Sequence, residues 1–221
     1  MQRVRIGLFA ACAALALGCV ATGPGPSPSG SSQQPRTEPV TPAEAQRLQR
    51  VMTPLLAKMN NPISIDQVSV GVIDSPEINA ANAGSGQFFV TKGLLERAND
   101  QQLSGVLAHE IAHEDLHHVA KAQVRAVGVG VGEVILQQIF PASGIVTPLA
   151  GQLVLAKYSR DEEYAADAHG AELLQRAGMN RDIMAQTLAW LVQEEGNSPG
   201  GFFATHPGTT DRIAALRNNG R

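Results

Sequence analysis

Two histidines and a glutamate in one short segment are the residues of this sequence best suited to chemistry. The segment runs from His109 to His113 and has the pattern His-Glu-x-x-His. Apolar residues recur at helical spacing from Gln101 onward, so we expect both imidazoles to lie on one face of a helix. Such a pair can hold a zinc ion, and Glu110 can then act as general base toward the water on the metal. The pattern predicts one Zn²⁺ per chain, with His109 and His113 as ligands.

A helix with solvated polar side chains would carry the same pattern by chance. Val106, Leu107 and Ile111 argue against this, because they predict a buried helix, in which unpaired His and Glu side chains are unfavourable. Cysteine cannot complete the site, since Cys12 and Cys19 both lie in the first twenty residues. The remaining protein ligands must therefore be histidine or carboxylate.

A zinc peptidase needs a third protein ligand and one open position for water. Metzincins place a third histidine six residues after the second, but this chain has Val119 there, and it has Leu116 where those enzymes require glycine. That class is therefore excluded. His117 and His118 continue the predicted helix without the required spacing, and we interpret both as structural or solvent-facing.

The chain of 221 residues is long enough for one domain with appendages. Its formal charge of −3 gives no reason to expect a nucleic-acid partner. Residues 1–18 carry two arginines followed by a short apolar core, which predicts a signal peptide. The segment Ala16-Leu17-Gly18-Cys19 resembles a bacterial lipobox and predicts a lipid anchor on Cys19, which would tether the protein to a membrane. An ordinary cleaved signal with an incidental cysteine is the alternative.

Residues 19–40 are rich in Gly, Pro, Ser and Gln and predict a flexible tether, so the folded domain is expected at residues 41–221. Thr41 and Glu44 predict a capping box at the start of a helix, with proline at its first position. This helix is expected to continue to residue 58 or 59, and its buried stripe is expected at Leu48, Val51, Leu55 and Met59.

A small sheet and further helices are expected to position the zinc helix. β-Branched residues, weak alternation and turn residues predict strands at 68–73, 78–83 and 87–91. A short helix is expected at 93–97, and Asp100 is expected to cap the zinc helix. We therefore expect an α+β fold that is mainly helical, with a small, mostly antiparallel sheet beside the zinc helix.

The segment Val134–Ala156 contains 23 residues without a charge, which is near the length of a membrane span. Glutamine, proline, serine and threonine interrupt it at several positions. Two buried or surface-covering helices are therefore a better interpretation than a span.

Several motifs together resemble the HtpX-like family of zinc peptidases. They are Asn79-Ala80, Gly86–Thr91, Gly93–Leu95 and the zinc helix, and residues 63–217 can be aligned with the family pattern. The family includes membrane CAAX prenyl proteases and periplasmic quality-control peptidases. The resemblance implies a zincin-like metallopeptidase domain with an edge strand that pairs with extended substrate backbones. In this chain that strand comprises Asn79, Ala80, Ala81 and Asn82.

The resemblance also implies a third zinc ligand. The segment Ser159–Asp167 matches the family motif Ser-Arg-x-x-Glu-x-x-Ala-Asp, in which Glu163 would be the ligand. Asp167 lies one turn later and would accept a hydrogen bond from the outer nitrogen of His109. A solvated acidic helix start is the alternative, and Glu162 is the fallback ligand, although it breaks the spacing of the motif.

A late His-Pro motif at Thr205–Pro207 completes the resemblance. His206 could donate a hydrogen bond to the developing oxyanion. Alternatively, its neutral imidazole could occupy the open position on zinc and keep the enzyme latent, or it could simply cap a helix. Arg212 is expected to pair with Asp167 or Glu162.

We therefore expect a zinc endopeptidase in which Glu110 takes a proton from the water and passes it to the leaving amine. With its lipobox, the chain is most similar to the small YggG/LoiP-type lipoprotein peptidases of the family. That resemblance implies an anchor at the periplasmic face of the outer membrane, misfolded or unassembled envelope proteins as substrates, and outer-membrane assembly machinery as a candidate partner. The alternative is a lipid-anchored chaperone or adaptor that holds unfolded clients, and a purely structural metal is a weaker one.

Overall fold

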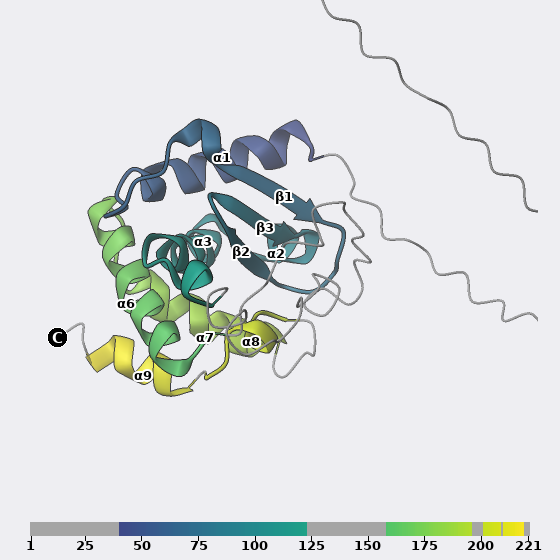
Figure 1. Ribbon diagram of the computed structural model, residues 1–221. Helices are drawn as coiled ribbons and strands as arrows, with labels where there is room; N and C mark the ends of the chain where they lie inside the picture. The colour runs from purple at the N-terminus through teal and green to yellow at the C-terminus, as the bar shows by residue number, and fades with distance from the viewer. Residues whose placement is uncertain (1–39, 123–157, 196–200, 209, 219–221) are drawn as a thin grey trace, which may run out of the picture. The chain divides into compact units, whose positions relative to one another are not determined.

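The computed structural model describes residues 40–122, 158–195, 201–208 and 210–218 (Figure 1). The predicted signal peptide, the predicted tether up to residue 39 and the segment 134–156 lie outside these residues. The described part is mainly helical with one small sheet, which confirms the expected α+β class. None of the helices formed by these residues combines the length and hydropathy that crossing a bilayer requires.

The elements follow the order expected for the sheet and for the zinc helix. Their bounds are α1 Pro42–Leu56, the 3₁₀ turn η1 Ile65–Gln67, β1 Ser69–Ile73, β2 Ala80–Gly84, β3 Gln87–Thr91, α2 Lys92–Arg97, α3 Asp100–Asp115, α6 Arg160–Arg176, α7 Ile183–Glu195, α8 Phe202–Thr205 and α9 Thr210–Asn218.

The sheet has the strand order β1-β3-β2, so β3 is its central strand. β2 and β3 are antiparallel and joined by a tight turn, in which Gly84, Ser85 and Gly86 all have positive φ. β1 runs parallel to β3, with Ser69 opposite Gln87. The expectation of a mostly antiparallel sheet was therefore wrong for one of the two pairings. The reason is that β3, not β2, pairs with β1, which leaves β2 at an edge (Figure 1).

Capping residues define where the first and the central helix begin. At α1, Thr41 and Glu44 form the predicted capping box, and the helix ends at Leu56, slightly before the expected end. At α3 the cap is Asn99 and not Asp100, because the Asn99 side chain accepts a hydrogen bond from the Gln102 backbone N–H at 2.9 Å. Asp100 instead becomes the first helical residue.

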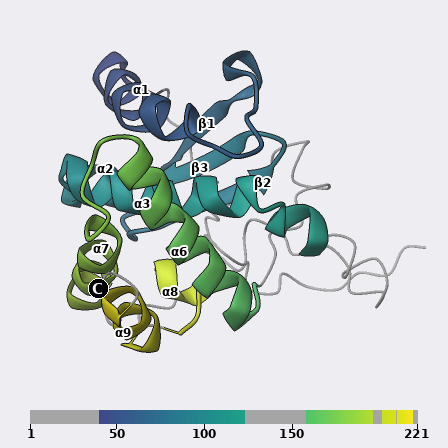
Figure 2. The same cartoon turned by 90° about the vertical axis from the view of Figure 1, so that its left-hand side faces the viewer.

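Helix α3 lies at the centre of the described domain, between α1, α6, α7 and β2 (Figures 1 and 2). Twelve of its sixteen residues are buried, so it has no solvent-facing stripe and its polar side chains must find partners inside the protein. Close packing depends on Gly105, where an added Cβ would lie only 2.1 Å from Thr187 Oγ1 of α7. The position of α3 is therefore fixed by close packing against the elements that surround it.

Candidate metal centre

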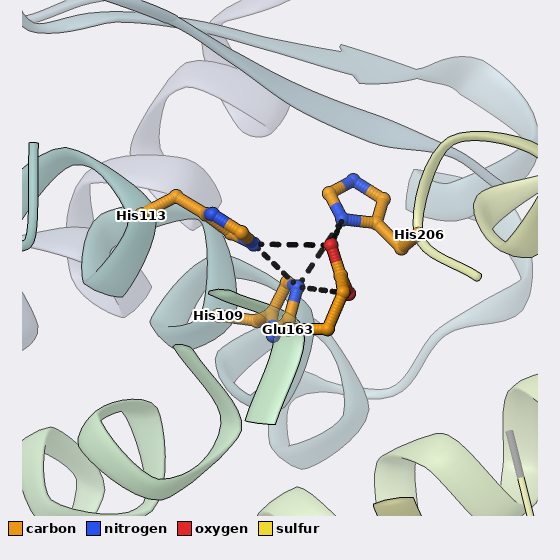
Figure 3. A group of neighbouring side chains, drawn as sticks. All are labelled: His109, His113, Glu163 and His206. Carbon is orange, nitrogen blue, oxygen red and sulfur yellow. Dashed lines mark hydrogen bonds and ion pairs between the residues drawn. The ribbon is translucent and has the colours of Figure 1, made fainter. Parts of the chain in front are cut away.

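Four buried side chains from three separate parts of the chain converge on one point (Figure 3). His109 and His113 project from α3, Glu163 from the first turn of α6, and His206 from the residue after α8. One candidate ligand atom from each residue lies within 4.8 Å of all the others. The structure therefore brings the predicted zinc ligands His109, His113 and Glu163 together with His206, which was expected either to donate to the oxyanion, to occupy the open position on zinc, or to cap a helix.

The spacing of these atoms fits a tetrahedral metal site. His109 Nε2 lies 3.0 Å from His113 Nε2 and 3.2 Å from His206 Nδ1. Glu163 Oε1 lies 3.2 Å from His206 Nδ1 and 3.6 Å from His113 Nε2. A tetrahedron with metal–ligand distances of about 2.0–2.1 Å has edges of about 3.3 Å, and nitrogen and carboxylate donors are those that zinc prefers. The residues present thus suit Zn²⁺ in both geometry and chemistry.

The start of α6 determines which acidic residue faces the cluster. Ser159 caps the helix, and the Glu162 carboxylate accepts hydrogen bonds from the Ser159 backbone N–H and hydroxyl, each at 2.9 Å. Glu162 is therefore the acidic member of a capping box. The next residue, Glu163, is fully buried and points toward α3. The fallback assignment of Glu162 as a ligand is excluded by its role in the cap.

A buried arginine holds the acidic side of the cluster together. Arg212 of α9 is 1% exposed and donates to both carboxylate oxygens of Asp167, at 2.6 and 2.7 Å. It also lies 2.6 Å from Glu163 Oε2 and donates to the backbone carbonyl of His206 at 3.1 Å. The expected pairing with Asp167 is present, and the second carboxylate partner is Glu163 in place of Glu162. One guanidinium group thus joins α6, α9 and the segment 201–207, which contains α8 and His206 and is called the His206 segment below.

Asp167 lies beside the outer ring nitrogen of His109, the position expected for the hydrogen-bond partner of a metal-binding histidine. Its Oδ1 atom is 3.0 Å from His109 Nδ1, the ring nitrogen that faces away from the cluster. Burial would lower the pKa of His109, but its hydrogen bonds with Asp167 and Glu163 raise it to about 9. The raised pKa means that the surrounding carboxylates stabilise a positive charge on His109. A metal cation bound at Nε2 would replace the proton there and supply that positive charge. Burial would raise the pKa of Asp167, but the hydrogen bond from Arg212 lowers it, so the carboxylate is ionised at neutral pH.

Glu110 has a buried carboxylate beside the cluster. The residue is fully buried, and neither of its carboxylate oxygens has a hydrogen-bond partner among the described residues, although His206 Nε2 lies 3.3 Å from Oε1. The Phe202 ring stacks on His206, with centroids 4.3 Å apart, and fixes the plane of that imidazole. A buried carboxylate whose only polar neighbour is one imidazole at 3.3 Å is poorly paired among the described residues. Poor pairing of this kind is typical of a group that acts on something bound at the site.

Two residues around His113 were not predicted. Tyr158 stacks on its ring at 3.8 Å, and His118 Nδ1 lies 2.9 Å from His113 Nδ1. The expectation that His117 and His118 continue the zinc helix was wrong, because α3 ends at Asp115 and His117 has a φ of +56°. His117 is exposed, whereas His118 is buried, and burial lowers the pKa of His118 to about 4. No glycine or proline in the sequence signals this break.

The predicted substrate strand is an edge strand, and it is connected to the His206 segment. The Asn79 side-chain amide donates to the Gly201 carbonyl at 3.3 Å, and the Phe202 N–H donates to the Ile78 carbonyl at 3.0 Å. Ala80, Ala81 and Asn82 lie in β2, whereas Asn79 precedes it, and all four residues are buried. Their role toward substrate stays a prediction, and Cys19 lies outside the described residues.

Comparisons with known proteins find relatives that are named as metalloproteases or proteases. Metalloprotease YcaL of Escherichia coli K12 is 28% identical over 165 residues, which cover 72% of this chain and 65% of that protein. Metalloprotease LoiP of the same strain is 27% identical over 187 residues, which cover 81% of this chain and 73% of LoiP. A protease HtpX homolog of Bacillus licheniformis is 31% identical over 186 residues, which cover 66% of this chain and 62% of that protein.

The family comparison covers most of the chain. Residues 42–219 match the model of peptidase family M48, so the match includes every member of the cluster in Figure 3. Each relative named above is longer than the part that this chain matches. Because the match extends from the first residue of α1 through α9, this chain belongs to peptidase family M48, a family of zinc metallopeptidases.

Proposed function

We propose that this protein is a zinc endopeptidase that cleaves unfolded or unassembled proteins of the cell envelope, with Glu110 as its general base. The observation that carries the proposal is the Glu110 carboxylate, fully buried beside four candidate metal ligands and without a hydrogen-bond partner among the described residues. A structural site would be closed by permanent ligands and would have no use for such a carboxylate. A hydrolytic site requires it.

The proposed mechanism assigns one role to each side chain. Bound zinc would supply a Lewis acid that activates water and polarises the scissile carbonyl. His109, His113 and Glu163 would hold the metal. Asp167 Oδ1 lies 3.0 Å from His109 Nδ1, where it would accept the outer N–H of His109 and so keep Nε2 directed inward. Glu110 takes a proton from the attacking water and delivers it to the amine as the peptide C–N bond breaks.

The position of His206 supports the latent interpretation over the oxyanion interpretation. Its Nδ1 atom lies among the candidate ligand atoms and its Nε2 atom lies beside Glu110. In this arrangement the imidazole stands where water would enter and contacts the proposed base. We therefore assign His206 as a fourth ligand at rest, which must turn away before a substrate is cleaved.

The proposed substrate class follows from the edge strand. β2 is at an edge of the sheet and three of its five residues are alanine, so it offers main-chain groups rather than large side chains. An extended peptide that adds to such an edge is held by main-chain hydrogen bonds, which any sequence can form. Unfolded polypeptides supply many such segments, whereas in a folded protein most backbone groups are already paired within its own secondary structure.

The test is to measure zinc content and cleavage of casein by the purified protein beside two variants. Glu110→Gln should keep about one zinc per chain and lose activity, because an amide cannot accept the proton. His206→Ala should be more active than wild type if His206 is the resting ligand, and inactive if it is an oxyanion donor. Glu96→Gln, an exposed glutamate on α2, is the matched control. Equal cleavage by wild type and Glu110→Gln would overturn the peptidase proposal.

The contact between His206 and Glu110 also supports the second candidate function, a binding protein with proteolysis switched off. Glu110→Gln separates the two functions, because it removes catalysis without removing β2 or the metal ligands. If the envelope phenotype of a deletion strain is rescued by Glu110→Gln, the protein acts by holding clients. If only wild type rescues it, the protein acts by cleaving them.

We propose that Cys19 anchors the protein to the periplasmic face of the outer membrane. The support is the lipobox-like segment that ends at Cys19, preceded by a short apolar core. Cys19→Ser should abolish labelling by a radioactive fatty acid and move the protein from the membrane to the periplasmic fraction. Cys12→Ser, within the same apolar core, is the control and should leave both unchanged.

A further inference from the structure

The two histidines of the zinc helix have different partners at their outer nitrogens. His109 Nδ1 lies 3.0 Å from the Asp167 carboxylate, the arrangement that metal-bound histidines commonly have. His113 Nδ1 instead lies 2.9 Å from Nδ1 of another histidine, His118, which is 4% exposed. A buried contact of this length between two ring nitrogens is a hydrogen bond, so one ring must donate and the other must accept.

The direction of this hydrogen bond follows from the chemistry of the site. A neutral imidazole has one protonated nitrogen and one lone pair. If His113 Nε2 binds zinc through its lone pair, the proton of His113 must be on Nδ1. His113 Nδ1 is then the donor, His118 Nδ1 is the acceptor, and the proton of His118 is on Nε2.

We propose that His118 is a positioning residue that accepts the Nδ1–H of His113 and thereby keeps His113 Nε2 directed at the metal. The proposal rests on the proposed role of His113 as a zinc ligand. It places His118 in the role for His113 that Asp167 has for His109. Tyr158, stacked at 3.8 Å with an interplanar angle of 24°, limits the tilt of the same ring from its face.

A break in the helix makes this contact possible. On a continuous helix, residues five apart are rotated by about 140° from one another, so position 118 would point away from position 113. Here α3 ends at Asp115, Leu116 is its C-cap, and His117 adopts a left-handed φ of +56°. The chain then resumes as helix at His118, whose side chain returns toward the site. The left-handed backbone at residue 117 thus turns the chain so that the buried side chain of His118 can reach His113.

The partner also differs from Asp167 in charge. An anionic acceptor makes a ligand imidazole more basic, whereas a neutral acceptor fixes its tautomer with less electron donation. A neutral partner on His113 adds no further negative charge to a site that already contains the carboxylates of Glu110, Glu163 and Asp167. His118 would therefore orient His113 without adding negative charge to the metal site.

The test compares His118→Leu with His118→Asn. Leucine retains bulk but cannot accept a hydrogen bond, whereas the asparagine side-chain oxygen can take the position of His Nδ1. His117→Asn makes the same change at the exposed neighbouring histidine and tolerates the left-handed backbone, so it is the matched control. The readout is zinc affinity, from competition with a chromogenic chelator at a temperature where circular dichroism shows every variant folded.

We expect His118→Leu to lower zinc affinity by about 10–100-fold, the range for loss of a partner to a ligand histidine, and His118→Asn to restore most of it. Wild-type affinity in His118→Leu, or equal losses in the leucine and asparagine variants, would overturn the proposal, because a purely structural role would not depend on the acceptor atom. If wild type itself binds no zinc, the proposed function fails. If wild type binds zinc and His118→Leu matches it, only the present inference fails.

A second measurement does not depend on any variant being folded. In the wild-type protein loaded with zinc and labelled with ¹⁵N at histidine, the ring nitrogens report where each proton resides. We expect a proton on His113 Nδ1, with a hydrogen-bonded shift, and no proton on His118 Nδ1. The opposite pair of tautomers would overturn the proposal.

Discussion

Replacing Arg212 by methionine should destabilise the protein strongly, because this arginine supports two buried carboxylates at once. Its guanidinium donates to both oxygens of Asp167 and lies 2.6 Å from Glu163 Oε2, and all three side chains are at most 2% exposed. Methionine preserves much of the volume and removes the charge. The change therefore tests electrostatics more than packing.

The magnitude follows from leaving buried charge without its partner. Breaking a buried ion pair from one side costs about 3–5 kcal/mol, and domains of this size are stable by about 5–15 kcal/mol. We expect the Arg212→Met variant to lose about 3–5 kcal/mol in the metal-free protein. With zinc bound the loss should be smaller, since the cation replaces the arginine as the counter-charge of Glu163. Asp167 keeps only its contact with His109 in both states.

The assay is urea unfolding at neutral pH, with EDTA and with excess zinc, followed by circular dichroism. Arg160→Met is the control, because Arg160 forms an ion pair of similar length, 2.8 Å, with Asp211, but both side chains are about two-thirds exposed. Exposed pairs contribute about 0–1 kcal/mol. If the two variants lose equal stability, burial of the Arg212 cluster has been overvalued and the reasoning is wrong.

Further predictions concern packing, strain, metal and pH. Gly105→Ala should lose about 1–3 kcal/mol in urea unfolding, because its Cβ would meet the Thr187 side chain at 2.1 Å. His117 has a left-handed φ of +56°, which glycine adopts readily and a β-branched residue does not. The free energy of unfolding of His117→Gly should therefore be unchanged or slightly higher, and that of His117→Val should be about 1–2 kcal/mol lower. EDTA should lower the Tm and one equivalent of zinc should restore it, in wild type but not in Glu163→Gln. The pKa of Asp167 is lowered in the folded protein, so its ionised carboxylate contributes to the free energy of unfolding above about pH 4. This contribution is lost as the pH falls through the lowered pKa. The free energy of unfolding of Asp167→Asn should therefore fall less steeply with decreasing pH in that range than that of wild type.

Local signals predicted the helices α1, α2 and α3, whereas α7, α8 and α9 were not predicted. The predicted capping box at Thr41 involves residues three apart, so it depends only on the adjacent chain. The strand at 87–91 was predicted with its observed bounds for the same reason. The capping box at Ser159 has the same local spacing as that at Thr41, but it was seen only in the structure. Errors of one residue, such as Asp100 for Asn99 at the start of α3, reflect two adjacent residues that are both good caps.

The sheet topology depended on information that is not local. A parallel pairing between β1 and β3 requires the chain to cross from one edge of the sheet to the other before it returns. The residues of a strand do not indicate which strand it will pair with. The alternation of buried and exposed side chains is the same in a parallel and in an antiparallel pairing. The expected edge position of β2 came from a family resemblance and not from the strand itself.

The sequence by itself determined that His109, Glu110 and His113 belong to one buried helix, since a helical period and apolar spacing are properties of adjacent residues. Only the tertiary structure decided that Arg212 would pair with Glu163 and that His118 would return to His113. These contacts join helices that are far apart in the chain, or cross a break that no residue type announces. They form because buried polar groups must find partners within the packed protein, and the packing of all the elements together decides which partners are within reach.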